Sequence, residues 1–371
     1  MRNFNEKVFF YCQPNQPGAI AYQHAMICLA EGFKALGIEY YSDINYWQIN
    51  SDNNEHLFLY NPNVTPDDCS IVVVDYEWFM QRRNLPKDLF HAKRKYKTVY
   101  FELHESEKRL SFLPEFRKFD FIFRGHYNNQ HWYHNNVHPW YFGLSNRILK
   151  ATEEPLVFEN RQNSIIFNFR HKKPVHSVRR YCDKVFLPQI ERIMVVDNTF
   201  DTKENQSLSN YDKLHNFQTG GRHFPSYYKR LKEAKACATF GGFFVSPFPR
   251  NQNLLISRGL KRFLTEFGFR SNRIDQWESW RFWESLAAGC VTFHVDFQKY
   301  GCSLPIMPEN WKHYVGVDLN NIPQAVDRLV SEPGILNEIS REGRSWAIEH
   351  YSPVSTAMRF LEVVSQQKDK N

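Results

Sequence analysis

The sequence has no close pair of cysteines. Its seven cysteines are dispersed over 371 residues without a C-x-x-C motif, and they are Cys12, Cys28, Cys69, Cys182, Cys237, Cys290 and Cys302. An odd and scattered set fits neither a disulfide framework nor a zinc cluster, and it is typical of a reducing compartment. We therefore expect a cytoplasmic protein without a disulfide framework.

Long hydrophobic runs are missing as well. No stretch approaches the roughly 18 consecutive apolar residues that indicate a membrane-spanning helix. The first residues, MRNFNEKVFFYC, hold no apolar stretch of the signal-peptide kind. Both features agree with a cytoplasmic location, and peripheral contact with the inner face of a membrane stays open.

The sequence also lacks a compact block of Lys and Arg. Lys and Arg together number 47 against 40 Asp and Glu, which gives a net charge of +7. This moderate excess suits an anionic ligand, an anionic membrane surface or a nucleic acid. Without a basic block, however, nucleic acid is not the favoured partner. The longest basic cluster is RHKK at residues 170–173.

What is present is the composition of a globular protein with the length of two domains. The chain is 42% hydrophobic and 23% charged, which excludes a disordered chain. At about 150 residues per domain, this length predicts two domains.

Short apolar runs alternate with helical or irregular segments along residues 1–150. A helix is predicted at residues 21–36. Strands are predicted at residues 7–12, 38–43, 56–61, 70–75, 96–106, 119–125 and within 138–148. Strands separated by helices favour βαβ units and a parallel sheet that is buried on both faces.

A second series of the same kind follows a polar stretch at residues 151–164. Strands are predicted at residues 164–170, 193–198 and 238–244, at the end of 277–296 and at 313–319. Helices are predicted after Pro174 and at residues 227–237, 322–333, 336–351 and 353–366. A long loop is predicted at residues 199–225. We therefore predict two Rossmann-like, doubly wound α/β domains, residues 1–150 and 151–350, that face each other across a cleft.

The basic cluster lies where the first strand of the second domain is expected to end. Arg170, Lys172 and Lys173 precede Pro174, which suits the first turn of a helix. Cations beside a helix N-terminus form a diphosphate site, because the backbone N–H groups and the helix dipole add to the side-chain charge. A solvated basic loop is the alternative. Gly18 marks a second backbone-rich turn between a strand and a helix.

Titratable side chains follow the predicted strands of the first domain. His104 ends the run TVYFELH, and Asp75 and Glu77 follow the run SIVVV. In a cleft at the carboxyl ends of the strands, each is placed for acid–base chemistry. A hydrogen-bonded loop residue is the alternative for each of them. His126, after FIFRG, ranks behind these candidates.

The segment WESWRFWESLAAGC at residues 277–290 predicts a helix that ends in a glycine turn and leads into a strand. Its three Trp side chains are interpreted as packing residues rather than as ligand-stacking residues. Glu284 needs a separate explanation, because a buried carboxylate requires a partner. An ion pair with Arg281, one helical turn away, is one option. A bidentate acceptor for the vicinal hydroxyls of a ribose is the other.

The run WESLAAGCV at residues 283–291 resembles the E-A-L-A-x-G-x-P-V signature of group-1 and exostosin-like glycosyltransferases, which have the GT-B architecture. The resemblance implies that Glu284 holds the ribose of a nucleotide-sugar. Group-1 members carry a second Glu eight positions upstream, near the transferred sugar. That position is Gln276 here, with Asp275 and Glu278 nearby. The vicinity of the donor is therefore assigned to Gln276, Glu278 and Arg281, together with Gly18.

The same resemblance implies further features of the site. Arg170 with Lys172 or Lys173 would neutralise the donor diphosphate in place of a metal ion, so neither a metal nor a cofactor is expected. His104, favoured over Asp75 and Glu77, would take the proton of the acceptor in an inverting reaction. The closing helices at residues 336–366 would cross back, which makes 351–371 a C-terminal helix against the first domain.

The predicted function is transfer of a sugar from a nucleotide-sugar donor to a hydroxyl acceptor, such as a glycan or a lipid-linked glycan, in the interdomain cleft. Two alternatives stay open. One is a glycosyltransferase that acts on a modified base in DNA. The other is a non-catalytic nucleic-acid-binding protein, which positive charge and aromatic side chains would serve.

Overall fold

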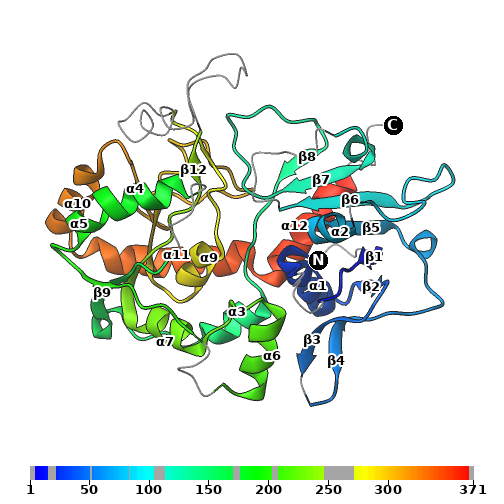
Figure 1. Ribbon diagram of the computed structural model, residues 1–371, viewed down its shortest axis with the longest axis horizontal. Helices are drawn as coiled ribbons and strands as arrows, with labels where there is room; N and C mark the ends of the chain where they lie inside the picture. The colour runs from blue at the N-terminus through cyan, green and yellow to red at the C-terminus, as the bar shows by residue number, and fades with distance from the viewer. Residues whose placement is uncertain are drawn as a thin grey trace.

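The computed structural model describes residues 5–15, 22–50, 52–82, 84–103, 113–169, 176–202, 208–245 and 271–366. The chain forms two α/β halves, each built around a parallel sheet (Figure 1). In the view of Figure 1 the first half lies on the right in blue and cyan, and most of the second half lies on the left in green to orange.

The first sheet has six parallel strands in the order β2-β1-β5-β6-β7-β8. The strands are β1 (Lys7–Tyr11), β2 (Glu39–Ser42), β5 (Ile71–Asp75), β6 (Lys97–Glu102), β7 (Phe121–Arg124) and β8 (Val137–Pro139). Strands β5 and β7 are buried at every position, as apolar runs are when helices cover both faces of a sheet. The strand order reverses at the β1/β5 boundary, which is the position where ligands bind in open α/β sheets.

Among the described residues before β8, two helices and a hairpin accompany this sheet. The helices are α1 (His24–Leu36) and α2 (Tyr76–Arg82), and the single turns η1 (Pro66–Asp68) and η3 (Phe116–Lys118) lie in the connections. Strands β3 (Tyr46–Asn50) and β4 (Glu55–Phe58) pair with each other in an antiparallel hairpin. The strand predicted at residues 56–61 therefore exists, but it belongs to this hairpin and not to the parallel sheet.

The second sheet has five parallel strands in the order β10-β9-β11-β14-β15, so its order reverses between β9 and β11. The strands are β9 (Gln162–Ile166), β10 (Val195–Asp197), β11 (Ala234–Ala238), β14 (Val291–Val295) and β15 (Val315–Val317), with a separate pair β12 (Phe243–Phe244) and β13 (Ile274–Asp275). The helices are α4 (Ser177–Val185), α5 (Leu187–Ile190), α7 (Pro225–Glu233), α9 (Trp280–Ala287), α10 (Ile322–Ser331) and α11 (Ile335–Tyr351), and the turn η4 (Phe158–Asn160) precedes β9.

Several segments differ from their predictions. Strand β11 occupies Ala234–Ala238, most of which was predicted as the end of the helix at residues 227–237. The strand predicted at residues 238–244 contains only the last residue of β11 and the separate strand β12. The predicted loop at residues 199–225 contains α6 (Asn210–Gln218), which Ser209 caps by accepting a hydrogen bond from the Asp212 backbone N–H at 3.1 Å. The predicted strand within residues 138–148 ends at Pro139 and is followed by α3 (Asn146–Ala151), with Ser145 as its N-cap. Both helices are short and largely polar, so the apolar periodicity that indicates a helix is weak in each.

Helix α12 (Pro353–Ser365) follows α11 and packs against α1 of the first half (Figure 1). Gly32 permits this approach, because a Cβ atom there would collide with the Pro353 carbonyl oxygen. The Phe360 ring lies 5.8 Å from Phe33 and 6.2 Å from Phe101. The C-terminal helix is thus part of the core of the first half, while the domain boundaries at 150 and 350 stay predictions.

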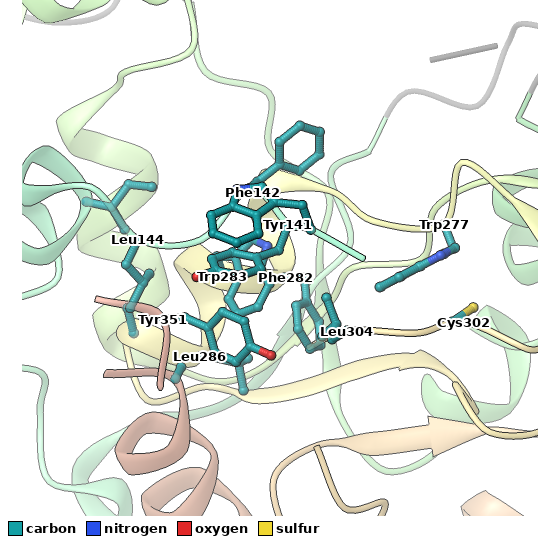
Figure 2. Packing of buried hydrophobic residues seen from close by; sticks show 14 of the residues in the cluster. Tyr141, Phe142, Leu144, Trp277, Phe282, Trp283, Leu286, Cys302, Leu304 and Tyr351 are labelled. Atoms are coloured by element: carbon teal, nitrogen blue, oxygen red, sulfur yellow. The ribbon is translucent and has the colours of Figure 1, made fainter. Parts of the chain in front are cut away.

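Aromatic side chains around α9 join the two halves in one core (Figure 2). The Trp283 ring lies 5.8 Å from Tyr141, which follows β8, and 4.5 Å from Tyr351 at the end of α11. Phe282 packs edge-on against Trp283 at 5.1 Å. Trp277 and Trp283 are completely buried, which confirms their interpretation as packing residues.

Within the described residues, no helix is both long and apolar enough to cross a membrane. The two doubly wound parallel sheets confirm the predicted pair of Rossmann-like units.

Candidate functional site

Asp75 lies at the switch point of the first sheet. It ends β5 and is almost completely buried. Its Oδ1 accepts hydrogen bonds from Gln23 Nε2 at 2.8 Å, from the Glu77 backbone N–H at 2.9 Å and from the Trp78 backbone N–H at 3.4 Å. Burial, reinforced by the charge of Glu77, raises the pKa of Asp75 to about 7. A carboxylate with this pKa is matched to general-base chemistry near neutral pH.

Glu77 lies in the first turn of α2, directly beside Asp75. The charge of Glu77 opposes ionisation of Asp75, as a neighbouring like charge does.

Arg281 and Asn168 lie at the corresponding edge of the second sheet. Arg281 Nε, on α9, donates a hydrogen bond of 3.2 Å to Oδ1 of Asn168, which is buried just after β9. Residues 170–173 begin two positions after Asn168 in the sequence. Arg281 therefore adds a positive charge at the strand end for which the diphosphate site is predicted.

Five predicted site residues lie outside the described residues. They are Gly18, His104, Arg170, Lys172 and Lys173. Their assignments stay predictions.

Glu284 is buried in the last turns of α9, with 5% of its surface exposed. Its Oε1 accepts a hydrogen bond of 2.7 Å from the Tyr228 hydroxyl. No ion pair joins Glu284 to Arg281 among the described residues, so the ion-pair alternative is wrong. The reason is that Arg281 points to Asn168 and α7 supplies the partner of Glu284 in the form of Tyr228.

The glycine turn after Glu284 is fixed by its surroundings. Gly289 has a φ of 70°, a left-handed conformation that disfavours side chains. A Cβ atom there would come within 2.9 Å of Arg161 Nη2. Arg161 in turn donates to the carbonyl oxygens of Gly289 and Ala288, at 2.6 and 2.9 Å. The turn brings the chain from the end of α9 directly into β14, so α9 is held against the sheet.

A buried arginine, not singled out from the sequence, completes the surroundings of Glu284. Arg147 on α3 donates from Nη1 to the Tyr228 hydroxyl at 2.7 Å and to His223 Nδ1 at 2.9 Å. From Nη2 it donates to the Tyr22 hydroxyl at 3.3 Å. Tyr22 precedes α1 in the first half, whereas Tyr228 and His223 belong to the second half. Arg147 therefore connects the two halves beside Glu284.

Arginine can only donate hydrogen bonds, and this fixes the protons around it. His223 must accept at Nδ1, so its Nε2 carries the proton and donates to Asp212 Oδ1 at 3.0 Å. Tyr22 accepts from Arg147 and therefore donates to His24 Nδ1, at 2.7 Å. Burial, with the charge of Arg147 as the second cause, lowers the pKa of His24 to about 3 and that of His223 to about 4. Both imidazoles are therefore neutral near pH 7.

Tyr22 and Gln23, which are neighbours in the sequence, connect the surroundings of Glu284 with those of Asp75. Tyr22 contacts Arg147 in the group around Glu284, and Gln23 contacts Asp75. Asp75 and Glu284 thus belong to two buried hydrogen-bonded groups that the peptide bond between Tyr22 and Gln23 joins. Tyr22, Gln23 and Arg147, which make these contacts, were not candidates from the sequence.

Gln276 and Glu278, assigned to the donor vicinity, lie in the segment before α9. Gln276 has a φ of 56°, which is uncommon for a side-chain-bearing residue and indicates local strain. Glu278 is buried, and its Oε1 accepts from the Phe142 backbone N–H at 2.6 Å and from Trp283 Nε1 at 2.7 Å. Burial raises the pKa of Glu278 to about 8. Glu278 thus joins the segment before α9 to residues that follow β8.

His126 also takes part in this contact. Its Nδ1 accepts a hydrogen bond of 3.2 Å from the Glu278 backbone N–H. A packing role between the halves is therefore what the described contacts assign to His126. Among the described residues, no group of three or more His, Cys, Asp or Glu side chains is arranged to hold a metal ion.

Two doubly wound α/β units, joined around a helix whose buried carboxylate precedes a glycine turn, define the GT-B class of fold. No protein-family model and no curated protein matches the sequence. Among solved structures, an alpha-glucosyltransferase in complex with UDP and a 13-mer DNA containing a HMU base is similar, with a TM-score of 0.55 and 9% sequence identity over 98% of this chain and 100% of that chain.

A structure of an alpha-glucosyltransferase with UDP and a 13-mer DNA containing a central A:G mismatch has a TM-score of 0.51, with 10% identity over 97% of this chain and 100% of that chain. At these identities the likeness shows the fold. The predicted GT-B architecture is therefore confirmed.

Proposed function

We propose that this protein is a glycosyltransferase that moves a sugar from a nucleotide-sugar donor to a hydroxyl acceptor between its two halves. The observation that carries the proposal is the hydrogen bonding of the Glu284 carboxylate. Glu284 stands in the run WESLAAGCV on α9, and one of its oxygens is held by Tyr228. Among the described residues no group donates to its other oxygen, Oε2. A fixed carboxylate with one available oxygen suits the hydroxyls of a ribose.

The donor diphosphate would lie beside the end of β9. Arg170 with Lys172 or Lys173 would contact it, and Arg281 adds charge from α9. Positive side chains that are already in place stabilise the charge that develops on a leaving diphosphate. In this proposal they act in place of a metal ion.

The acceptor would approach from the first half. Asp75 is the described residue best suited to remove its proton, because its pKa of about 7 lets it be both ionised and basic near neutral pH. His104, which was favoured from the sequence, and Glu77 are the other two candidates for this role. Buried aromatic side chains between the halves would limit access of water to the donor.

The acceptor class proposed first is a glycan, a lipid-linked glycan or a similar hydroxyl compound. A hydroxyl on a modified base in DNA is the second candidate, which two observations favour. The two solved structures with the same fold described above are alpha-glucosyltransferases in complex with DNA, and this chain has a net charge of +7.

Thermal unfolding with UDP, GDP, ADP and CDP tests the donor part of the proposal. We expect one of them to raise the melting temperature of the wild type and to have no such effect on Glu284→Ala or Arg170→Ala. A wild type that none of the nucleotides stabilises would contradict the proposal. Retention on DNA that falls with salt, without any nucleotide binding, would point instead to a non-catalytic nucleic-acid-binding protein.

A further inference from the structure

We infer that Arg147 and Tyr228 are positioning residues for the nucleotide: Arg147 fixes the Tyr228 hydroxyl, which holds one oxygen of Glu284 and thereby aims the other at the ribose. The inference rests on the proposed function. It also assigns to Tyr22, in the first half, a part in donor recognition by the second half.

The chain of hydrogen bonds has a single direction. Tyr228 has one hydroxyl proton, and at 2.7 Å from each neighbour it can give that proton only to Glu284, because Arg147 has no acceptor atom. A hydrogen bond to an ionised carboxylate is about twice as strong as a neutral one. Oε1 of Glu284 is therefore occupied, and the rotation of the carboxylate is fixed.

Burial makes this arrangement rigid. Arg147 is 4% exposed and Tyr228 2% exposed, so water does not compete for the hydrogen bonds. Both protons of Arg147 Nη1 are used, one by Tyr228 and one by His223. Asp212 holds the far side of that imidazole. A guanidinium held in this way cannot turn without breaking several contacts at once.

The first half takes part through Tyr22. Its hydroxyl accepts from Arg147 Nη2, and its ring lies 5.5 Å from Trp280 of α9 and 5.6 Å from Trp47 of the β3–β4 hairpin. Residues of both halves thus surround one guanidinium. The rotation of Glu284 in the second half should therefore depend on the position of the residues that precede α1.

Recognition of the ribose provides the test. Isothermal titration would compare the dissociation constant of UDP with that of 2′-deoxy-UDP, or of GDP, ADP or CDP and its 2′-deoxy form if another base binds best. In the wild type we expect the ribose form to bind about tenfold or more tightly, the effect of a hydrogen bond to a charged group. Glu284→Gln should abolish most of this preference.

Tyr228→Phe is the decisive variant. We expect its preference for ribose to fall below about threefold, because the carboxylate loses the contact that orients it. Tyr227→Phe is the matched control. It is the same substitution at the neighbouring residue, whose buried hydroxyl has no hydrogen-bond partner among the described residues. It should keep the preference of the wild type, and circular dichroism would confirm that each variant is folded.

Tyr22→Phe is a second variant, which also serves if Tyr228→Phe fails to fold. It should reduce the preference about two- to fivefold, because Arg147 loses one acceptor and keeps two. If Glu284→Gln loses the preference while Tyr228→Phe and Tyr22→Phe keep it, the inference is overturned and the proposed function stands. If the wild type binds no nucleoside diphosphate, or binds ribose and deoxyribose forms equally, the proposed function fails and the inference fails with it.

Discussion

Gln48 and Gln218 exchange two hydrogen bonds across the two halves of the protein. The Gln48 backbone N–H donates to Gln218 Oε1 at 2.8 Å, and Gln218 Nε2 donates back to the Gln48 carbonyl oxygen at 2.9 Å. Gln218, the last residue of α6, thus pairs with strand β3 as a neighbouring strand would. This side chain ties the hairpin of the first half to the second half, next to the ring contact of 5.5 Å between Trp47 and His215.

Gln218→Leu should therefore weaken the contact between the halves. The substitution leaves the backbone N–H and the carbonyl oxygen of Gln48 without these partners. An unsatisfied group costs about 1–3 kcal/mol when it is fully buried, and less when it is partly buried, as these two groups are. We expect the free energy of unfolding in urea to fall by roughly 1–3 kcal/mol. Gln324→Leu, at an exposed position of α10, should change it by less than about 0.5 kcal/mol. Equal values for both variants would contradict the role of this pair.

Asp75 should give the stability a specific pH dependence. The folded protein raises the pKa of Asp75 to about 7, whereas the unfolded chain has about 3.9. Between these values the folded state keeps a proton that the unfolded chain has lost. The contribution of this group to the free energy of unfolding is therefore fully present at and below about pH 4, falls as the pH rises, and levels off above about pH 7.

Asp75→Asn removes this dependence. Its amide oxygen can accept the same three hydrogen bonds without a charge. Urea unfolding would be measured at pH 4, 5.5 and 7. As the pH rises, the free energy of unfolding of the wild type should fall, relative to that of the variant, by on the order of 2–4 kcal/mol. In the control Asp120→Asn, the wild type should show no such loss over this range. There, hydrogen bonds from Arg94 and Thr98 outweigh burial and lower the pKa. Parallel profiles for the wild type and Asp75→Asn would contradict the assignment.

Comparing Gly289→Ala with Gly221→Ala separates the cost of backbone strain from the cost of a steric collision with Arg161. Gly289 and Gly221 have φ angles of 70° and 73°, but a Cβ atom meets Arg161 only at Gly289. Gly221→Ala should cost about 1 kcal/mol from backbone strain alone. Gly289→Ala should cost about 1–3 kcal/mol more, because Arg161 must shift away from the two carbonyl groups that it holds. Thermal or urea unfolding measures both, and equal losses would show that Arg161 can yield freely.

The parts of the fold that the sequence predicted are those with local signals. Apolar runs such as IVVVD predicted most strands of both sheets, and WESLAAGC predicted the helix, turn and strand around Glu284. Strand β11 was missed, because its sequence AKACA continues the helical pattern of residues 227–237. Helix α6 was missed although Ser209 and Asp212 have the spacing of a helix N-cap. Its polar residues lack the apolar stripe on which the prediction depended.

The site was predicted only where position along the chain determines position in space. Glu284 could be predicted because it precedes a glycine turn, and Asp75 because it ends a strand. Arg147 could not be predicted, because its partners Tyr22 and Tyr228 lie 125 and 81 residues away in the sequence. Nothing in SNRILK distinguishes a buried arginine from an exposed one on a helix. Such a residue is found only when the two halves are seen together.

Turnover of the donor tests the central claim most directly. Purified wild type and Glu284→Ala would be incubated with UDP-, GDP-, ADP- and CDP-sugars, and release of the nucleoside diphosphate would be followed with glycan acceptors and with DNA that carries a hydroxymethylated base. We expect the wild type to consume one donor and Glu284→Ala, still folded by circular dichroism, to be slower by about 100-fold or more, because the ribose loses hydrogen bonds to a charged group. A variant that turns over the donor as fast as the wild type would contradict the account.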